Sequence, residues 1–170
     1  MYSTKGFTLI ELIVVIILLS IVSALGIGLF GAPSSYTARL TSDQWLSQLR
    51  MSQRMSLIKQ SASDLVVLTI SDTGTQWLME LQQGATDISS QSIDKDDVIL
   101  RGSTTDFSGP CSALPAMALP ASWYFDGYGE RVTATRVAIN VNQRLCFDGN
   151  QDVDICLAPS GFAYRGVCDG

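Results

Sequence analysis

Glu11 is an isolated charge at the start of a long apolar stretch. From Leu12 to Phe30 the sequence has no charged residue, and the next charge is Arg39. A carboxylate in a membrane helix costs about 2.5–3.5 kcal/mol at the bilayer centre, less near the interface, and usually has a partner. Two interpretations follow. Either Glu11 lies at the interface with its side chain reaching toward water, or it pairs with a cation that processing creates.

The apolar stretch is long enough to span a bilayer, because about 20 apolar residues cover the roughly 30 Å hydrocarbon core. A secretory signal has a shorter apolar region of about 7–15 residues and then a cleavage site with small residues. Here the small residues at 23–26 lie inside a run that continues past them. Lys5 is the only basic residue ahead of the run, so the N-terminus is predicted to be cytoplasmic and the rest to face outward.

Cleavage between Gly6 and Phe7 would supply the cation. The new α-amino group of Phe7 would lie four residues before Glu11. In an assembly of parallel helices, the amine of one chain can then meet the carboxylate of its neighbour.

Residues 5–12, Lys-Gly-Phe-Thr-Leu-Ile-Glu-Leu, resemble the prepilin signature of type IV pilins and type II secretion pseudopilins. In that family a membrane peptidase cuts after the Gly and methylates the new Phe, and the Glu at the fifth mature position guides subunits into a helical filament. The resemblance implies these roles for Gly6, Phe7 and Glu11. It also implies three partners: other pilin subunits, the prepilin peptidase and an inner-membrane assembly platform.

Composition argues against several other functions. The formal charge is −5, and loss of Lys5 leaves ten basic against sixteen acidic residues, so nucleic acid is disfavoured as a partner. The chain has no His, which removes Ser-His-Asp and Cys-His catalysis and His-ligated zinc. No constellation supports an enzyme, and no cofactor is expected apart from the calcium considered below.

Four cysteines, all beyond the apolar stretch, predict disulfides in an oxidising compartment. There is no CxxC pair, so zinc ribbons and thioredoxin-like motifs are unsupported. Three connectivities are possible, and free buried thiols are the alternative. A turn sequence separates Cys146 from Cys156, which favours a local clip; Cys111 would then pair with Cys168.

One stretch has the composition of a calcium loop. Asp148, Asn150, Asp152 and Asp154 place oxygen ligands at alternate positions, as in the first part of an EF-hand. Val153 stands where that pattern needs Gly, and no Glu occupies its twelfth position. A solvated acidic turn is the favoured alternative.

The segments predict an α+β protein with a pilin-like fold, in which a long N-terminal helix packs on antiparallel strands. We expect a cleaved leader at 1–6, a transmembrane and assembly helix at 7–32, its amphipathic second half at 33–62, and a β-rich periplasmic domain with two disulfides at 63–170. Pro33 marks a kink or break near the membrane exit.

The second helical segment carries two apolar stripes. They suit packing against a sheet on one side and neighbouring subunits on the other; a single wide core face is the alternative. Beyond it, a hairpin and further short strands are predicted around a Gly/Ser/Pro-rich loop at 102–121. The stripes are Leu46, Leu49, Gln53 and Leu57, and Met51, Met55, Ile58 and Ala62; the strands are 65–70, 76–81, 98–100, 122–125, 132–141, 143–147, 155–158 and 162–167.

Two patterns in the second half resemble minor pilins and pseudopilins of the FimT and GspH type. Residues 125–129 match Phe-x-x-x-Gly, and residues 158–165, Ala-Pro-Ser-Gly-Phe-Ala-Tyr-Arg, are similar to Ser-x-Gly-x-x-Arg. Glycines of this kind also suit tight turns. With the predicted disulfides, the resemblance is closest to minor pilins of the MSHA type.

Two classes of function therefore compete. The first is a structural subunit of a pilus, minor rather than major, or of a GspH-like secretion pseudopilus, held in the bacterial inner membrane and then assembled at the cell surface. The second is a tip-displayed module that binds DNA or a surface ligand. Such a module would use a basic strip, but residues 123–170 have four arginines against six acidic residues. The strip would be Arg131, Arg136, Arg144 and Arg165.

The mature protein should begin at a methylated Phe7, because Gly6 leaves an unhindered bond ahead of the apolar run. Intact-mass spectrometry of the membrane-extracted protein checks this. Replacing the small residue, as Gly6→Trp, should leave an uncut precursor in the membrane. A mature chain that begins after residue 24 would instead indicate ordinary secretion.

Overall fold

Two helical segments precede the strands of the chain. The computed structural model describes residues 8–29, 36–60, 63–104 and 109–168, and side chains of 24–29 are not described. The chain divides into two units, Met1–Ser35 and Tyr36–Gly170. Helix α1, Leu9–Leu29, belongs to the first. The predicted leader, Gly6, Phe7 and Pro33 lie outside the described residues.

Helix α2, Thr37–Lys59, opens the second unit. It ends because Gln60 adopts the left-handed conformation (φ 35°) and donates its N–H to the Ser56 carbonyl, a common helix termination. Helix α2 lies within the amphipathic helical segment predicted at 33–62.

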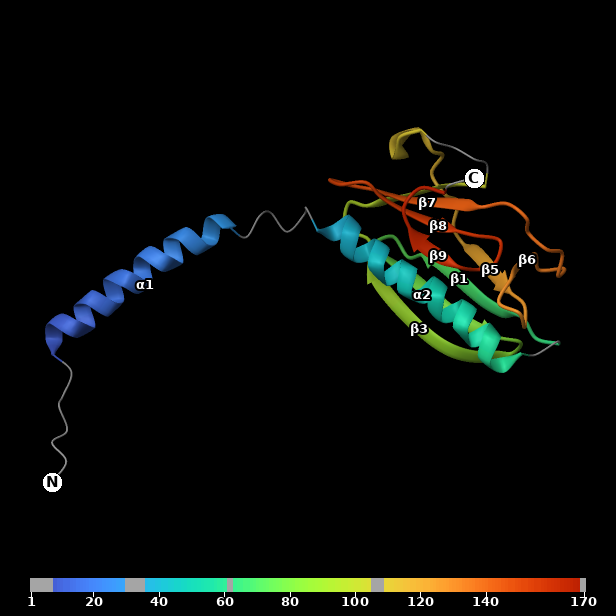
Figure 1. Cartoon of the computed structure of the whole chain (residues 1–170), viewed down its shortest axis with the longest axis horizontal. Coiled ribbons are helices and arrows are strands. Elements are labelled where there is room, and N and C mark those ends of the chain that lie inside the picture. Colours follow the sequence, from blue (N-terminus) through green and yellow to red (C-terminus); the bar gives the residue numbers. More distant parts are fainter. Residues whose placement is uncertain (1–7, 30–35, 61–62, 105–108, 169–170) are drawn as a thin grey trace, which may run out of the picture. The chain divides into compact units, whose positions relative to one another are not determined.

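The strands form two antiparallel sheets, and α2 lies along them (Figure 1). Sheet A has the order β3-β2-β1-β5-β6, and sheet B has the order β4-β7-β8-β9. The second unit is thus α+β, as predicted, and this is consistent with a pilin-like fold. The elements are β1 Val66–Asp72, β2 Gln76–Gln83, β3 Thr86–Asp94, β4 Ile99–Ser103, the 3-10 turn η2 Cys111–Ala113, β5 Ala121–Phe125, β6 Arg131–Val132, β7 Gln143–Asp148, β8 Val153–Leu157 and β9 Ala163–Arg165.

The predicted first hairpin is confirmed. Strands β1 and β2 pair antiparallel from Val66 opposite Gln83 to Asp72 opposite Trp77, and alternate residues face the core. At the turn, Asp72 accepts hydrogen bonds from Lys95 Nζ (2.6 Å) and the Gly74 N–H (2.8 Å). These two bonds lower the pKa of Asp72.

Two strand predictions were wrong. Strand β3 was missed because its serine-rich sequence is mostly exposed at a sheet edge and has little apolar alternation. The long strand predicted at 132–141 stops at Val132. Arg136 has a φ of 66° and its N–H bonds to the Thr133 carbonyl, so the chain turns there.

The two predicted stripes of α2 differ in burial. In the first, Leu46 and Leu49 are buried and Leu57 is 42% exposed; in the second, Ile58 is 75% exposed. Between the buried apolar residues lie small serines whose hydroxyls bond to carbonyls of the same helix, so burying them leaves no hydroxyl unpaired. These are Ser42 to Arg39, Ser52 to Gln48 and Ser56 to Gln53.

Trp45 joins α2 to both sheets. Its ring is fully buried and meets Trp77 of β2 at 5.4 Å, Trp123 of β5 at 6.1 Å and Phe147 of β7 at 5.4 Å, each edge to face. Edge-to-face pairs at these distances add about 0.5–1.5 kcal/mol beyond the area that they bury. A single helix residue thus holds two strands of sheet A and one of sheet B.

Replacing Trp45 by Ala should lower the free energy of unfolding by about 3–5 kcal/mol, since it opens a cavity among three other rings. Denaturant unfolding of the full chain in detergent, followed by far-ultraviolet circular dichroism, measures this. Tyr128→Ala is the control, because Tyr128 is 83% exposed and its loss should change stability by less than about 0.5 kcal/mol. If both variants lost the same free energy of unfolding, the aromatic cluster would not be what holds α2 and the two sheets together.

Candidate functional site

Glu11 has a local role that the sequence analysis missed. Thr8 precedes the first turn of α1 and Glu11 lies three residues later, which is the spacing of a capping box. The Glu11 N–H donates to Thr8 Oγ1 (3.4 Å), and the Thr8 N–H donates to Glu11 Oε2 (3.5 Å). The Thr-x-x-Glu pattern was a sufficient signal for this contact. A carboxylate near the N-terminus of a helix also interacts favourably with the helix dipole.

Helix α1 is apolar on every described side. Its large apolar side chains between Leu9 and Val22 are 42% to 75% exposed within this one chain, and Glu11 is its only charged residue. A helix that is hydrophobic all round is normally buried in protein or lipid.

The sequence analysis predicted a transmembrane segment at 7–32. Among the described residues, no helix combines the length and the hydropathy needed to cross a membrane. The structure therefore does not support a transmembrane segment at 7–32, and that segment stays a prediction.

The cysteines form two disulfides, but the predicted pairing was wrong. Cys111 is bonded to Cys146 and Cys156 to Cys168, with Cα–Cα distances of 5.8 and 5.0 Å. In the β7–β8 ladder Cys146 is opposite Asp154, not opposite Cys156. The two cysteines are therefore diagonal neighbours, about 7–8 Å apart, too far for a bridge without backbone movement.

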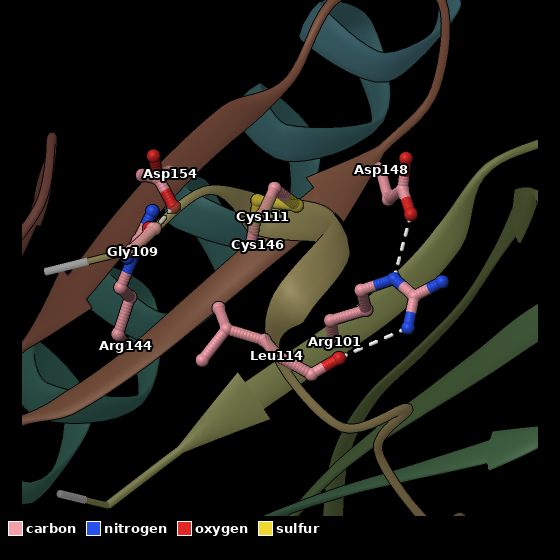
Figure 2. Close-up of a disulfide and its surroundings, with 8 residues drawn as sticks. All are labelled: Arg101, Gly109, Cys111, Leu114, Arg144, Cys146, Asp148 and Asp154. Carbon is pink, nitrogen blue, oxygen red and sulfur yellow. Dashed lines mark hydrogen bonds and ion pairs between the residues drawn. A yellow bond between two sulfur atoms is a disulfide. The ribbon is translucent and has the colours of Figure 1, made fainter. Parts of the chain in front are cut away.

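The outer face of sheet B is organised by two arginines around the first disulfide (Figure 2). Arg101 Nε lies 2.6 Å from Asp148 Oδ2, and Arg144 Nε lies 2.8 Å from Asp154 Oδ1. Arg101 is directly opposite Cys146 in the β4–β7 ladder, so the ion pairs flank the disulfide. The sequence contained a signal for these contacts, because charged residues and cysteines alternate along β7 and β8 and so lie on the same face of the sheet.

The calcium prediction gains no support. No group of three or more His, Cys, Asp or Glu side chains in the described part of the chain is arranged to hold a metal ion. Two of the four predicted ligands, Asp148 and Asp154, are bonded to arginines instead. Their oxygens are therefore already neutralised by guanidinium groups.

The proposed basic strip does not form. Arg131 and Arg144 are buried, at 3% and 4% exposure. Arg165 is bonded to Asp43 of α2, and Arg136 to the carbonyl of Ser63. Each of the four guanidinium groups therefore has an intramolecular partner, although Arg136 and Arg165 are exposed.

Arg131 connects the two sheets. From β6 its Nη1 donates to the carbonyls of Val141 (3.1 Å) and Leu157 (3.0 Å), and its Nη2 donates to Gln143 Oε1 (2.8 Å). The same oxygen of Gln143 accepts the indole N–H of Trp123 at 2.8 Å. Burial lowers the pKa of Arg131 to about 10, so it stays charged at neutral pH.

The glycines of the two second-half patterns meet in space. Gly129 and Gly161 both have positive φ, of +79° and +76°, and a Cβ on Gly161 would lie 2.0 Å from the Gly129 carbonyl oxygen. A Cβ on Gly129 would also touch Leu57, and Gln53 donates to the Ser160 carbonyl (2.8 Å). These patterns therefore fix two turns against the end of α2.

Comparison with family models gives one match, over residues 1–27, to the prokaryotic N-terminal methylation motif. This motif indicates a protein of the type IV pilin or pseudopilin type, which in general is processed by a prepilin peptidase and assembles with other pilin subunits. It also suggests a membrane-anchored protein that later reaches the pilus surface. Neither the curated proteins nor the solved structures include a match.

Removing either disulfide should destabilise the chain by about 2–4 kcal/mol. The separations are 35 residues for Cys111–Cys146 and 12 for Cys156–Cys168, so loop-closure entropy predicts about 1 kcal/mol more for the first. The double Cys→Ser variants of each pair are compared by urea unfolding without reductant. Non-reducing peptide mapping of the unmodified chain checks the pairing, and a Cys146–Cys156 peptide would contradict it.

Proposed function

We propose that this chain is a minor pilin, a structural subunit of an MSHA-like type IV pilus, which enters the filament through its N-terminal helix and helps to initiate or cap assembly and adhesion. The observation that carries the proposal is the methylation motif at residues 1–27 together with a helix that exposes apolar side chains all round. Such a helix needs lipid before assembly and other helices after it.

The minor role rests on the second-half resemblance. Its glycines hold two turns against α2, so they specify the architecture of the globular unit rather than a ligand site. The chain is accordingly proposed to act without catalysis. A pseudopilin would share the N-terminus but would stay in the envelope, so finding the chain in sheared surface filaments supports the pilus.

In this proposal Glu11 attracts the methylated amine of Phe7 in a neighbouring subunit. The capping box gives the same side chain a second role, in starting its own helix. Three variants separate the roles. Glu11→Gln keeps a capping side chain and loses the charge, Thr8→Ala weakens the cap and keeps the charge, and Glu11→Val loses both.

Glu11→Gln and Glu11→Val should each lower the ratio of filament to membrane protein at least about tenfold, which corresponds to about 1.4 kcal/mol of lost attraction. Membrane levels and disulfides should be unchanged, because the globular unit has its own core. Thr8→Ala should enter filaments nearly normally. Quantitative immunoblots of sheared filaments and membranes measure the ratio.

A different pattern among the three variants would contradict a docking role for the Glu11 charge. If Glu11→Gln enters filaments at the wild-type ratio while Thr8→Ala and Glu11→Val do not, the residue acts as a helix cap and its charge does not guide docking.

A further inference from the structure

The loop Gly109–Pro120, here called the clamped loop, is fastened to the outer face of sheet B at three points (Figure 2). Cys111 is bonded to Cys146. Arg144 Nη1 donates to the Gly109 carbonyl (2.7 Å), and Arg101 Nη1 donates to the Leu114 carbonyl (2.9 Å).

Each of these arginines is itself held in place by a carboxylate. Asp154 accepts from Arg144, whose side chain is 5% exposed, and Asp148 accepts from Arg101. The clamp thus combines a covalent bond with two charge-assisted networks. Charge-assisted hydrogen bonds are roughly twice as strong as neutral ones.

The second half of the clamped loop is also tied to β4. The Gly102 N–H donates to the Pro115 carbonyl (3.1 Å), and the Met117 N–H donates to the Leu100 carbonyl (2.9 Å). Ala116 forms an isolated antiparallel bridge with Arg101. The loop therefore has a fixed backbone along most of its length.

Beneath this loop, Cys111, Leu114 and Cys146 form a small core of their own. Met117 and Leu119 of the loop are partly buried against the main core. The clamp also holds an outward surface of small, uncharged side chains. The exposed residues are Pro110, Ser112, Ala113, Pro115, Ala116, Ala118 and Pro120.

This surface differs in charge from the rest of the unit. From residue 36 onward the sequence has ten basic and fifteen acidic residues, and its longest run without a charge is 107–125. Acidic units brought together in one assembly repel each other. A charge-free surface is where another unit approaches at least electrostatic cost.

We propose that the clamped loop is the surface through which the globular unit contacts a neighbouring pilin-type subunit, whose facing surface is uncharged and apolar. This rests on the proposed function. A surface that is ordered before binding loses little conformational entropy on contact, and this is what the disulfide and the two arginines achieve.

The test introduces charge on the exposed surface. Ala113→Glu and Ala118→Glu should lower the filament-to-membrane ratio roughly tenfold, because each buries an unpaired carboxylate at the contact. Ala85→Glu is the matched control, since Ala85 is exposed in the β2–β3 turn of the other sheet, and it should enter filaments normally. Non-reducing gels confirm that each variant has formed its disulfides.

A photo-crosslinking arm does not depend on the effect of added charge. Benzoylphenylalanine at position 113 or 118 should give a light-dependent adduct with another pilin-type subunit, and at position 85 it should not. If the unmodified chain is in filaments but both loop variants enter normally and neither position cross-links, this inference alone is overturned. If the unmodified chain is absent from filaments, the proposed function fails and the inference falls with it.

Discussion

The globular unit depends on one indole. Trp45 is the point where α2, sheet A and sheet B meet, and its contacts with Trp77, Trp123 and Phe147 are all edge to face. The buried Trp45 Nε1 has no hydrogen-bond partner in the part of the chain that the structure describes. Buried residues of α2 and of both sheets belong to one hydrophobic cluster, so the helix is packed into the core that the two sheets share.

A second contact between the two sheets is polar, and Trp123 takes part in both this contact and the aromatic cluster around Trp45. The indole N–H of Trp123 and the guanidinium of Arg131 share the Oε1 atom of Gln143. The two Nη atoms of Arg131 donate to neutral oxygens, and its buried Nε has no partner among the described residues. A buried cation of this kind is weak evidence for stability. The Arg131 side chain does fix the position of β6 relative to β7 and β8. If β6 were shifted along these strands, the guanidinium N–H groups would no longer point at the carbonyls that accept them.

The sequence predicted those features that local pattern controls. The β1–β2 hairpin, a second helix within 33–62 and the α+β class all follow from periodicity and turn residues. The disulfide pairing did not follow, because it depends on a two-residue stagger between Cys146 and Cys156 that only the β7–β8 register fixes. The basic strip failed for the same reason. Arg131 and Arg144 are close in sequence to exposed turns, yet the sheets turn both side chains into polar contacts inside the fold.

The start of α1 joins local structure to assembly. In the single chain, the Glu11 carboxylate is held near its own helix start by the Thr8 N–H at 3.5 Å, a long and weak contact. Cleavage after Gly6 would create the new amine on Phe7, one residue before Thr8 in the sequence. In the proposed filament, a neighbour's amine would compete with this intrachain contact, and a low local dielectric, in lipid or among packed helices, would strengthen the pair of full charges. The capping box keeps the carboxylate at the helix start, which is where the proposed docking to a neighbour's amine would need it.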